Sequence, residues 1–457
     1  MMTERQGYQL KMHSLTIEDL VPENHLLRKV ERIIKWDFIY ETVRELYSET
    51  TGRPSIDPVI LVKYLLVGYL YGIESERRIE QEIEVNMAYR WFLGLDIGEQ
   101  VPDHSTISQN RKRRFNGTGL FRQIFEEIVR QCIEAGLVDG KVVLTDSTHV
   151  KANGSRRRNI TVEIESETTD YMRRLDAAEA NERQQLEQAG KIKPQRRSRA
   201  SKEPVRREKT ICATDPDAGM LNRPGKPKGP HYLSHQSIDP SHGIIVDAAV
   251  TPGSANDSTP YLERIEYIRS HFGLPIQTAG ADSAYGTTLI FKTLEDMHIQ
   301  LYTPGTSGGT TYQVGLKRDD FLYDEEADQF ICPQGNQLPL RSLERTEHNI
   351  CRVYRAERAD CQACPLYSRC VANSHYSRTV RVNIFEAAAK RQQSGGSQSE
   401  RRHILELRQI LCEGAFAAQK ARHNLRQLFR RGIEAAEDHC LLSATAFNIK
   451  LMVRCLG

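Results

Sequence analysis

The chain has 457 residues, of which 27% are charged and 39% hydrophobic, a balance that excludes a wholly disordered or collagen-like protein. The net charge of +3 comes from 63 Lys and Arg against 60 Asp and Glu. It excludes a uniformly basic coat for DNA, although local basic patches remain compatible with it. At about 150 residues per domain, the length predicts two to four domains.

The apolar runs are too short for a membrane span. The run at 59–70 is interrupted by Lys63 and falls short of the roughly 20 residues that a transmembrane helix needs. The N-terminus lacks the basic start and apolar core of a signal peptide. We therefore expect a cytoplasmic, nucleoid-associated protein with no membrane partner. In that compartment its ten cysteines should be thiols or metal ligands.

The first part of the chain, 1–137, predicts a helical domain. Apolar residues recur every three to four positions in four segments, 25–47, 57–72, 75–93 and 118–136. A further short helix follows Pro102, with Asp103 or Ser105 as its N-cap, and ends in Arg111, Lys112, Arg113 and Arg114. A small helical domain with one strongly basic helix is typical of helix-turn-helix DNA binding. An ordinary bundle with a solvated basic face explains the same residues equally well.

The pattern changes at Gly140, after which strands and helices alternate. We expect strands at 142–148, 232–238, 243–250, 274–281 and 299–302, and helices at 257–271 and 287–297. These elements form the first part of a core at 138–305. A charged insertion at about 155–210 interrupts it, with an expected helix at 160–190. Residues 191–209 hold nine Lys and Arg against two Glu, which predicts a flexible arm that contacts phosphates or a plain solvated linker.

The last third divides into an insertion and two helices. Residues 306–398 are irregular in texture and rich in cysteine. A long helix at 400–431 and a closing helix at 433–455 then complete the core at 399–457. This order of elements is that of an α/β, ribonuclease H-like core.

Three acids occupy the chemically special positions of that core. Asp146 lies on the first strand, Asp282 at the end of the fourth, and Glu413 on the late helix. Carboxylates from separate elements suit a pair of Mg²⁺ (or Mn²⁺) ions, which activate a nucleophile and stabilise the leaving oxygen in phosphodiester cleavage. Taken singly, the three could be a strand-end cap, a turn former and a surface acid. Asp215 and Asp217 are left out of the site because prolines and glycines around them indicate a turn.

Several motifs make the chain resemble a known family. They are VLTDSTHVKAN at 143–153, TDPDAG at 214–219, GKPKG at 225–229, VTPGSANDS at 250–258, ADSAY at 281–285, CQACPL at 361–366, EGAFAAQK at 413–420 and PDHST at 102–106. With these, the chain resembles the DDE transposases of bacterial insertion sequences, in the group with a cysteine-rich segment between the second Asp and the Glu. The resemblance implies that Asp146, Asp282 and Glu413 are the catalytic metal ligands. It also implies that Arg408 and Lys420 contact DNA, whereas the stretch at 421–426 departs from the family pattern.

The cysteines at 332–370 indicate a second metal site. Cys361 and Cys364 have the two-residue spacing of zinc ligands, with Cys370 shortly after them and Cys332 upstream. Cys351 competes for the fourth place. The site is expected to hold one structural Zn²⁺, and the alternative is a knot of reduced thiols.

The expected function is that of a transposase. It would bind the terminal inverted repeats of its element as double-stranded DNA, cleave the ends and transfer the 3′-hydroxyls to target DNA, as a homodimer when two ends are paired. One alternative is a catalytically idle, transposase-derived DNA-binding regulator. A stand-alone nuclease fits less well, because the basic front domain and arm indicate placement on a duplex.

Overall fold

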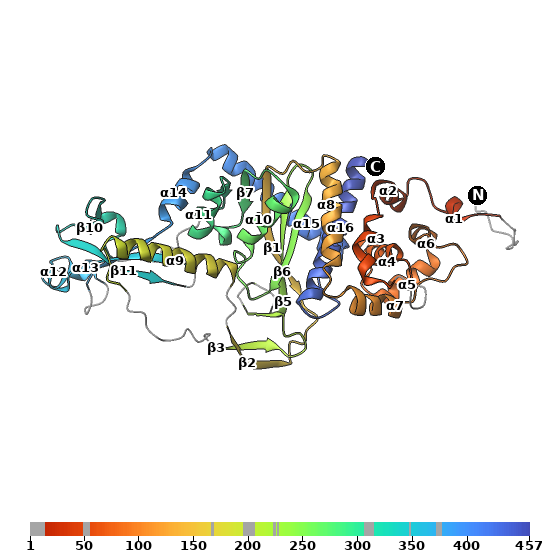
Figure 1. Cartoon of the computed structure of the whole chain (residues 1–457), viewed down its shortest axis with the longest axis horizontal. Helices are drawn as coiled ribbons and strands as arrows, with labels where there is room; N and C mark the ends of the chain where they lie inside the picture. The colour runs from red at the N-terminus through yellow and green to blue at the C-terminus, as the bar shows by residue number, and fades with distance from the viewer. Residues whose placement is uncertain are drawn as a thin grey trace, which may run out of the picture.

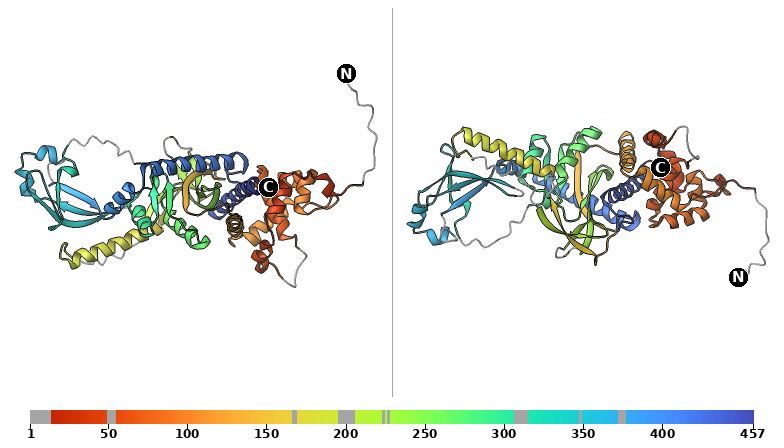
Figure 2. Two further views of the ribbon diagram at one scale, coloured as in Figure 1. Left: turned by 90° about the horizontal axis from the view of Figure 1, so that it is seen from above. Right: turned by 60° about the horizontal axis from the view of Figure 1, so that its bottom comes forward.

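The computed structural model describes residues 14–48, 55–165, 169–194, 206–222, 225, 228–305, 315–346, 349–371 and 377–457. Figure 1 shows three parts in a row: a helical module at one end, a sheet flanked by helices in the middle, and a second sheet at the other end. The same order appears in both views of Figure 2. The part of the basic arm at 195–205 lies outside the described residues.

The helical module contains short helices packed around one buried helix. These helices are α1 (Ile17–Leu20), α2 (Leu26–Ile33), α3 (Phe38–Val43), α4 (Pro58–Tyr71), α5 (Glu76–Val85), α6 (Met87–Leu93), α7 (His104–Asn110) and α8 (Leu120–Glu134). Helix α4 begins with Pro58 after the N-cap Asp57 and ends at Gly72, whose φ of 69° a glycine adopts without strain. Nearly all its side chains are buried, as expected of a helix that is apolar all round.

The helical module contacts the central part of the molecule through its last helix. Helix α8 packs against α16 (Ile433–Leu456) and strand β6 (Ile244–Pro252). The single helix expected at 25–47 is instead divided into α2 and α3.

No single helix among the described residues is long and apolar enough to cross a bilayer, and α4 with α5 reaches that length only as a pair bent by 95°.

The central sheet has the strand order of a ribonuclease H-like core. Its strands are β1 (Val142–Lys151), β5 (Gly229–Asp239), β6, β7 (Thr278–Ala281) and β8 (Gln300–Tyr302), with short β4 (Gly219–Leu221) on β5. They lie in the order β6-β5-β1-β7-β8, with β1, β5 and β6 antiparallel and β1, β7 and β8 parallel. Counted along the chain this is 3-2-1-4-5, so the predicted fold class is confirmed.

Helices cover the sheet. They are α10 (Tyr261–Phe272), α11 (Thr288–Asp296), α15 (Gln398–Arg422) and α16. Helix α15 packs on β1, β5, β7 and β8, and α16 packs on β6. The long helix therefore crosses the strands that carry two of the predicted acids.

The charged insertion differs from the expected helix. Residues 159–165 form β2 (Asn159–Glu165), which pairs with β3 (Arg206–Cys212), and only then does α9 (Asp170–Gln188) begin. Ile160, Val162 and Ile164 alternate with polar residues, which is the period of a strand. The high charge of the segment obscured that alternation. The last residues of the predicted basic arm thus belong to a strand.

The cysteine-rich insertion is more regular than its sequence suggests. It contains a five-stranded antiparallel sheet in the order β13-β12-β11-β10-β9, whose strands are β9 (Leu322–Asp324), β10 (Gln329–Ile331), β11 (Gln337–Arg345), β12 (Ile350–Arg355) and β13 (Thr379–Asn383). Short helices α12 (Arg358–Gln362) and α13 (Tyr367–Cys370) precede β13, and α14 (Glu386–Ser394) leads back to the core.

The predicted helix at 400–431 ends nine residues early, at Arg422. Asn424 adopts a left-handed conformation with φ 62°. Its Nδ2 donates to the carbonyls of Gly68 (3.2 Å) and Ile73 (3.1 Å) in the helical module. These bonds turn the chain out of the helix and hold the following loop between the module and the sheet.

Candidate active site

Asp146 and Asp282 lie side by side on neighbouring parallel strands. The register pairs Thr145 of β1 with Ala281 of β7, so the next residue on each strand is one of the two acids. Asp282 ends β7, and its Oδ1 accepts a 2.6 Å hydrogen bond from the backbone N–H of Ser283. Because adjacent residues in register project to the same face, the two carboxylates share one side of the sheet.

That side is the one covered by α15. Arg408 on α15 donates from Nη1 to Oδ2 of Asp146 at 2.9 Å, and Lys420 donates from Nζ to Thr148 Oγ1 at 2.6 Å. The buried Cys412 lies between them, with its Sγ 3.7 Å from the carbonyl of Leu144. The helix is thus fixed across β1 at three points along its length.

Glu413 lies on α15 beside Cys412 and is exposed. It precedes Lys420 by seven residues, which is two helical turns, so both project from the same flank of α15. Lys420 shows that this flank faces the part of β1 beyond Asp146. The structure therefore places the three predicted acids on the elements expected for them, with Glu413 accessible to solvent.

Burial changes the titration of Asp146. Desolvation raises the pKa of its carboxyl, and the negative charges of Asp282 and Asp257 raise it further. The backbone N–H of Ser147 and the guanidinium of Arg408 act in the opposite direction. Neighbouring negative charges disfavour the ionised form of a carboxyl group, and a nearby cation favours it. A bound cation would therefore stabilise the ionised form of Asp146.

Asp257 is an acid of this region that sequence reasoning missed. It follows β6, is half-buried, and its charge raises the pKa of Asp146 and of the buried Tyr285 phenol, which burial raises first. Tyr285 itself follows Asp282 by one helical turn and packs edge-on against Tyr261, with ring centroids 4.9 Å apart. The motif 250–258 contained the signal, although its Asn-Asp-Ser sequence was read only as a helix start.

Four of the six predicted DNA contacts, including Lys420 with its bond to Thr148, have partners within the chain. Arg111, 7% exposed, donates to Glu76 at 2.5 Å, and Arg408 pairs with Asp146. Arg114 lies over the ring of Tyr47 at 4.1 Å. Lys112 and Arg113 are exposed. The basic surface of this helix is smaller than the sequence predicts, because the end of α7 winds into a π-helical turn, 111–115, that turns Arg111 inward.

Four cysteines of the insertion line one small cavity together with Arg378, and these are the four predicted for zinc, Cys332, Cys361, Cys364 and Cys370. Backbone N–H groups donate to three of the sulfurs: Asn336 to Cys332 (3.3 Å), Leu366 to Cys364 (3.4 Å) and Arg378 to Cys361 (3.4 Å). Burial raises the pKa of Cys370, Arg378 lowers it, and the other three thiols raise it. Cys351 lies on β12 outside this set.

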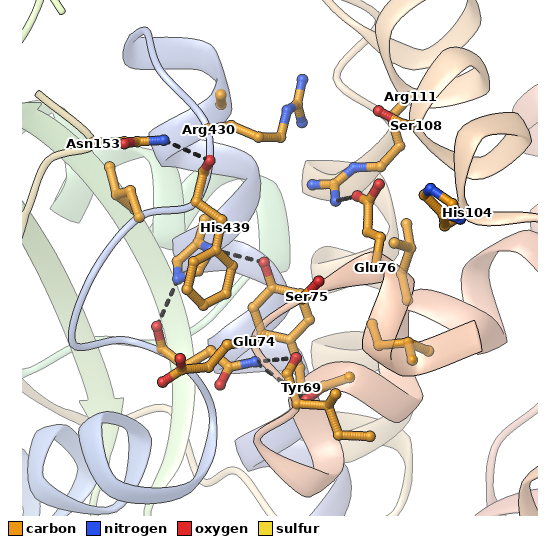
Figure 3. A pocket seen from close by; sticks show the side chains of 18 of the residues that line it. Tyr69, Glu74, Ser75, Glu76, His104, Ser108, Arg111, Asn153, Arg430 and His439 are labelled. Atoms are coloured by element: carbon orange, nitrogen blue, oxygen red, sulfur yellow. Dashed lines mark hydrogen bonds and ion pairs between the residues drawn. The ribbon is translucent and has the colours of Figure 1, made fainter. Parts of the chain in front are cut away.

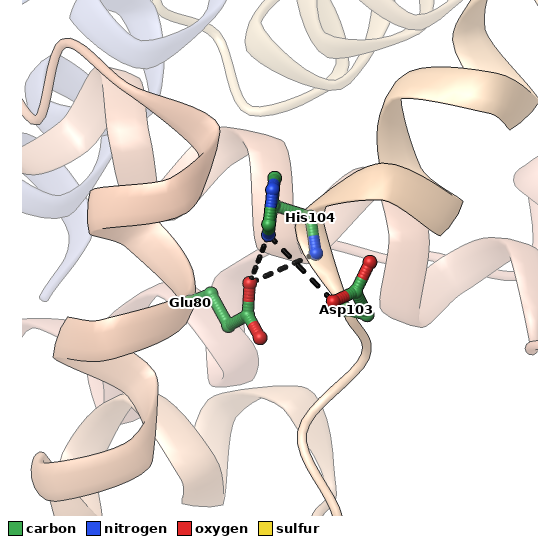
Figure 4. Close-up of side chains that lie close together, drawn as sticks. All are labelled: Glu80, Asp103 and His104. Atoms are coloured by element: carbon green, nitrogen blue, oxygen red, sulfur yellow. Dashed lines mark hydrogen bonds and ion pairs between the residues drawn. The ribbon is translucent and has the colours of Figure 1, made fainter.

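A different group brings three ligand atoms within 4.8 Å of one another in the described part of the chain. It consists of Glu80, Asp103 and His104 (Figure 4). Asp103 caps α7 by accepting from the N–H of Ser105 at 2.7 Å, and a 2.6 Å hydrogen bond joins His104 Nδ1 to Glu80. These hydrogen bonds give the three residues a structural role at the start of α7, and Asp103 is confirmed as its N-cap. Within the described residues, neither the carboxylate oxygens of Asp146, Asp282 and Glu413 nor the four cysteine sulfurs form a group with all ligand atoms within 4.8 Å of one another.

Asp215, which the sequence left outside the site, has a structural role. It is fully buried and its Oδ1 accepts from Tyr232 Oη at 2.8 Å and from the N–H of Gly432 at 3.1 Å. Asp217 accepts from the N–H of Ile433 at 3.0 Å. Both residues therefore fix the start of α16 on the sheet.

The strand order, the acid on β1, the acid directly after β7 and the helix that crosses both strands define a ribonuclease H-like enzyme. Two family models match the chain: "Transposase domain (DUF772)" over residues 15–113, and "Transposase DDE domain" over residues 331–453. The chain thus contains two stretches that match transposase domains, the second of them of the DDE type, in agreement with its motifs. The second match includes Glu413, whereas Asp146 and Asp282 lie outside both matched stretches.

Among solved structures, the chain is similar to a piggyBac transposase, determined by cryo-EM as a synaptic complex with hairpin DNA. The identity is 8%, and the match covers 94% of this chain and 72% of that one, with a TM-score of 0.35. That likeness is too low to carry fold or function from one protein to the other.

Proposed function

We propose that this transposase cleaves DNA at the terminal inverted repeats of its element and joins the freed 3′-hydroxyls to target DNA. The observation that carries the proposal is the register that sets Asp146 beside Asp282 under the helix bearing Glu413. Carboxylates on three separate elements can hold reacting phosphates in line through cations, without a covalent link between protein and DNA.

The donor set fits divalent metal ions. Asp146, Asp282 and Glu413 offer only oxygen atoms, which Mg²⁺ and Mn²⁺ prefer. Burial raises the pKa of Asp146, and the nearby charges of Asp282 and Asp257, which a cation would offset, raise it further. When bound, a pair of such ions would activate the attacking oxygen and stabilise the leaving one. The chain itself supplies the rigid part: β1 and β7 fix the two aspartates, while α15 presents Glu413 at the accessible edge.

Basic side chains around the acids provide the DNA contacts of the proposal. Lys420 lies on the flank of α15 shared with Glu413, and Lys112 and Arg113 are exposed on the helical module. We assign double-stranded terminal repeats and target DNA as partners, with residues 195–205 adding unspecific phosphate contacts. Two copies of the chain would pair two ends, in the cytoplasm and on the nucleoid.

The cysteine cavity is proposed to hold a structural Zn²⁺. Its four sulfurs are the number and kind of ligand that a structural zinc ion takes, and backbone N–H groups that donate to sulfur stabilise thiolates. The insertion that contains α12 and α13 lies at one end of the molecule, away from the central sheet (Figure 1). A metal bound to its cysteines would therefore stabilise the insertion and take no part in cleavage.

The experiment that tests the proposal uses the full-length chain, Mg²⁺, and a circular DNA carrying the element's own ends. We expect nicks at the outer edge of both repeats, 3′-hydroxyl products, and joined products when target DNA is added. Tight binding to the repeats with no cleavage in Mg²⁺ or Mn²⁺ would instead establish the idle regulator.

A further inference from the structure

A groove separates the helical module from the sheet (Figure 3). One wall is made by the end of α4, the turn after it and the start of α5, and the other by the loop that joins α15 to α16. Its volume is about 1100 Å³. This is slightly more than the volume of small-ligand sites, about 300–1,000 Å³, so the groove has room for a few nucleotides of a single strand.

Two guanidiniums meet in this groove. Arg111 is 7% exposed and pairs with Glu76, yet its Nε has no hydrogen-bond partner among the described residues. Arg430, from the opposite wall, pairs with Asp438 at 3.3 Å. Burial lowers the pKa of Arg430, and the charge of Arg111 lowers it further. Two like-charged guanidiniums that line one groove repel each other, and an anion such as a phosphate would relieve that repulsion.

The rim adds three more cations. Arg77, Lys112 and Arg431 all line the groove and are exposed. Against the five basic side chains stand Glu74 and Glu76, the second of which is already engaged by Arg111. The groove is therefore positive on balance, unlike the chain as a whole.

An aromatic ring lies among these cations. Phe429 lines the groove and remains 38% exposed, and its ring meets that of His439 edge-on, with centroids 5.1 Å apart. His439 is held by hydrogen bonds to Tyr69 Oη (2.8 Å) and to the carbonyl of Asn424 (2.7 Å). The edge-on contact leaves a face of Phe429 available, on a rigid support. Exposed aromatic rings in basic grooves are the usual platforms for unpaired bases.

The groove is joined to the proposed catalytic acids by continuous backbone. Strand β1 runs from Asp146 to Lys151, which bridges to Gln427, and Asn153 donates from Nδ2 to the carbonyl of Phe429 at 2.8 Å. Helix α15 runs from Glu413 to the same loop. The acids and the groove therefore lie along the same strand and the same helix.

We propose that this groove holds unpaired nucleotides of the DNA end, with a base stacked on Phe429 and a phosphate between Arg111 and Arg430. The inference rests on the proposed function, because it names the part of that substrate which the groove would take. It adds a single-strand site to a protein otherwise expected to bind duplex DNA.

The test compares two DNA probes on the full-length protein without added divalent metal. One is a blunt duplex, and the other is the same duplex with a short unpaired extension at one 3′ or 5′ end. Fluorescence anisotropy should show tighter binding to an extended duplex. Phe429→Ala should weaken binding to that duplex about tenfold and leave blunt-duplex binding unchanged, since stacking on one aromatic ring is worth about 1–3 kcal/mol per base.

Two matched variants control the experiment. Phe429→Tyr keeps a ring and should keep the preference, and Tyr323→Ala removes an aromatic residue of similar exposure, 40%, from the distant insertion and should change neither affinity. Equal wild-type affinity for both probes, or an equal loss on both in Phe429→Ala, would overturn the groove assignment. Metal-dependent cleavage of repeat DNA is measured separately, so a protein that prefers unpaired ends but never cleaves would refute only the proposed function.

Discussion

Arg408 and Asp146 form an ion pair of 2.9 Å between the long helix and the central strand. Both side chains are largely buried, with 12% and 18% of their surfaces exposed. The pair docks α15 on β1 and places a fixed positive charge beside an acid whose pKa is raised by desolvation. Arg408 is predicted as a DNA contact, but its guanidinium is paired with Asp146, which we propose as a metal ligand.

Removal of that charge should make the protein more dependent on a divalent cation. Without added metal, Arg408→Ala should melt at a lower temperature than wild type, because it leaves Asp146 beside Asp282 without its counter-ion. Mg²⁺ or Mn²⁺ should then raise the melting temperature more in Arg408→Ala than in wild type. Arg402→Ala, an exposed change on the same helix, is the control. An equal metal-induced shift in all three proteins would show that Arg408 and the cation act independently.

The consecutive basic residues of the helical module should separate into two classes. Arg111→Ala should destabilise the fold by about 2–3 kcal/mol, below the cost for a fully buried pair because Glu76 keeps some contact with solvent. Lys112→Ala should change stability by no more than about 0.5 kcal/mol. It should also weaken DNA binding and reduce the salt slope by about one. Chemical denaturation and binding titrations at several salt concentrations measure both effects, and a stable Arg111→Ala protein would contradict the assignment.

The zinc proposal predicts about one equivalent of metal per chain, since four thiolates satisfy one tetrahedral ion. Elemental analysis of protein purified without added metal should find it in wild type and in Cys351→Ser, whose sulfur lies outside the cavity. The double variant Cys361→Ser/Cys364→Ser should lose the zinc and much of its solubility. Less than half an equivalent in wild type would leave the cluster as reduced thiols.

Acid should destabilise the protein through its buried histidines. Burial lowers the pKa of His235, His423 and His439 to about 4 each. Between pH 6.5 and 4 the unfolded chain thus binds more protons than the folded one. The contribution of these neutral rings to the free energy of unfolding is fully present above pH 6.5. It decreases as the pH falls, by on the order of 1–2 kcal/mol per histidine at pH 5.

Thermal melting from pH 7.5 to 5 tests this dependence. The melting temperature should fall with pH, and His439→Gln should flatten the curve, whereas the exposed His403→Gln should leave its slope as in wild type. A melting temperature that does not change over this range would contradict the buried, neutral state of the three rings.

The sequence predicted the core better than its surroundings, for physical reasons. The apolar run before Asp146 and the strand before Asp282 have lengths and end signals that local patterns reveal. The approach of Asp257 to them depends on how β6 ends in space, which no local pattern encodes. The small sheet of the insertion is hard to predict because two of its five strands, β9 and β10, span only three residues each, too short for any periodicity. Arg111 was misjudged because a buried and an exposed arginine look identical in a basic run.

The most direct test of the account is metal-dependent cleavage of terminal-repeat DNA by variants of the three acids. Asp146→Asn, Asp282→Asn and Glu413→Gln should each abolish cleavage in Mg²⁺ while binding the repeat within a few-fold of wild type. Glu406→Gln, an exposed change one heptad earlier on the same helix, should cleave normally. Cleavage at a near wild-type rate by any one of the three variants would remove that residue from the site and contradict the arrangement of acids proposed here.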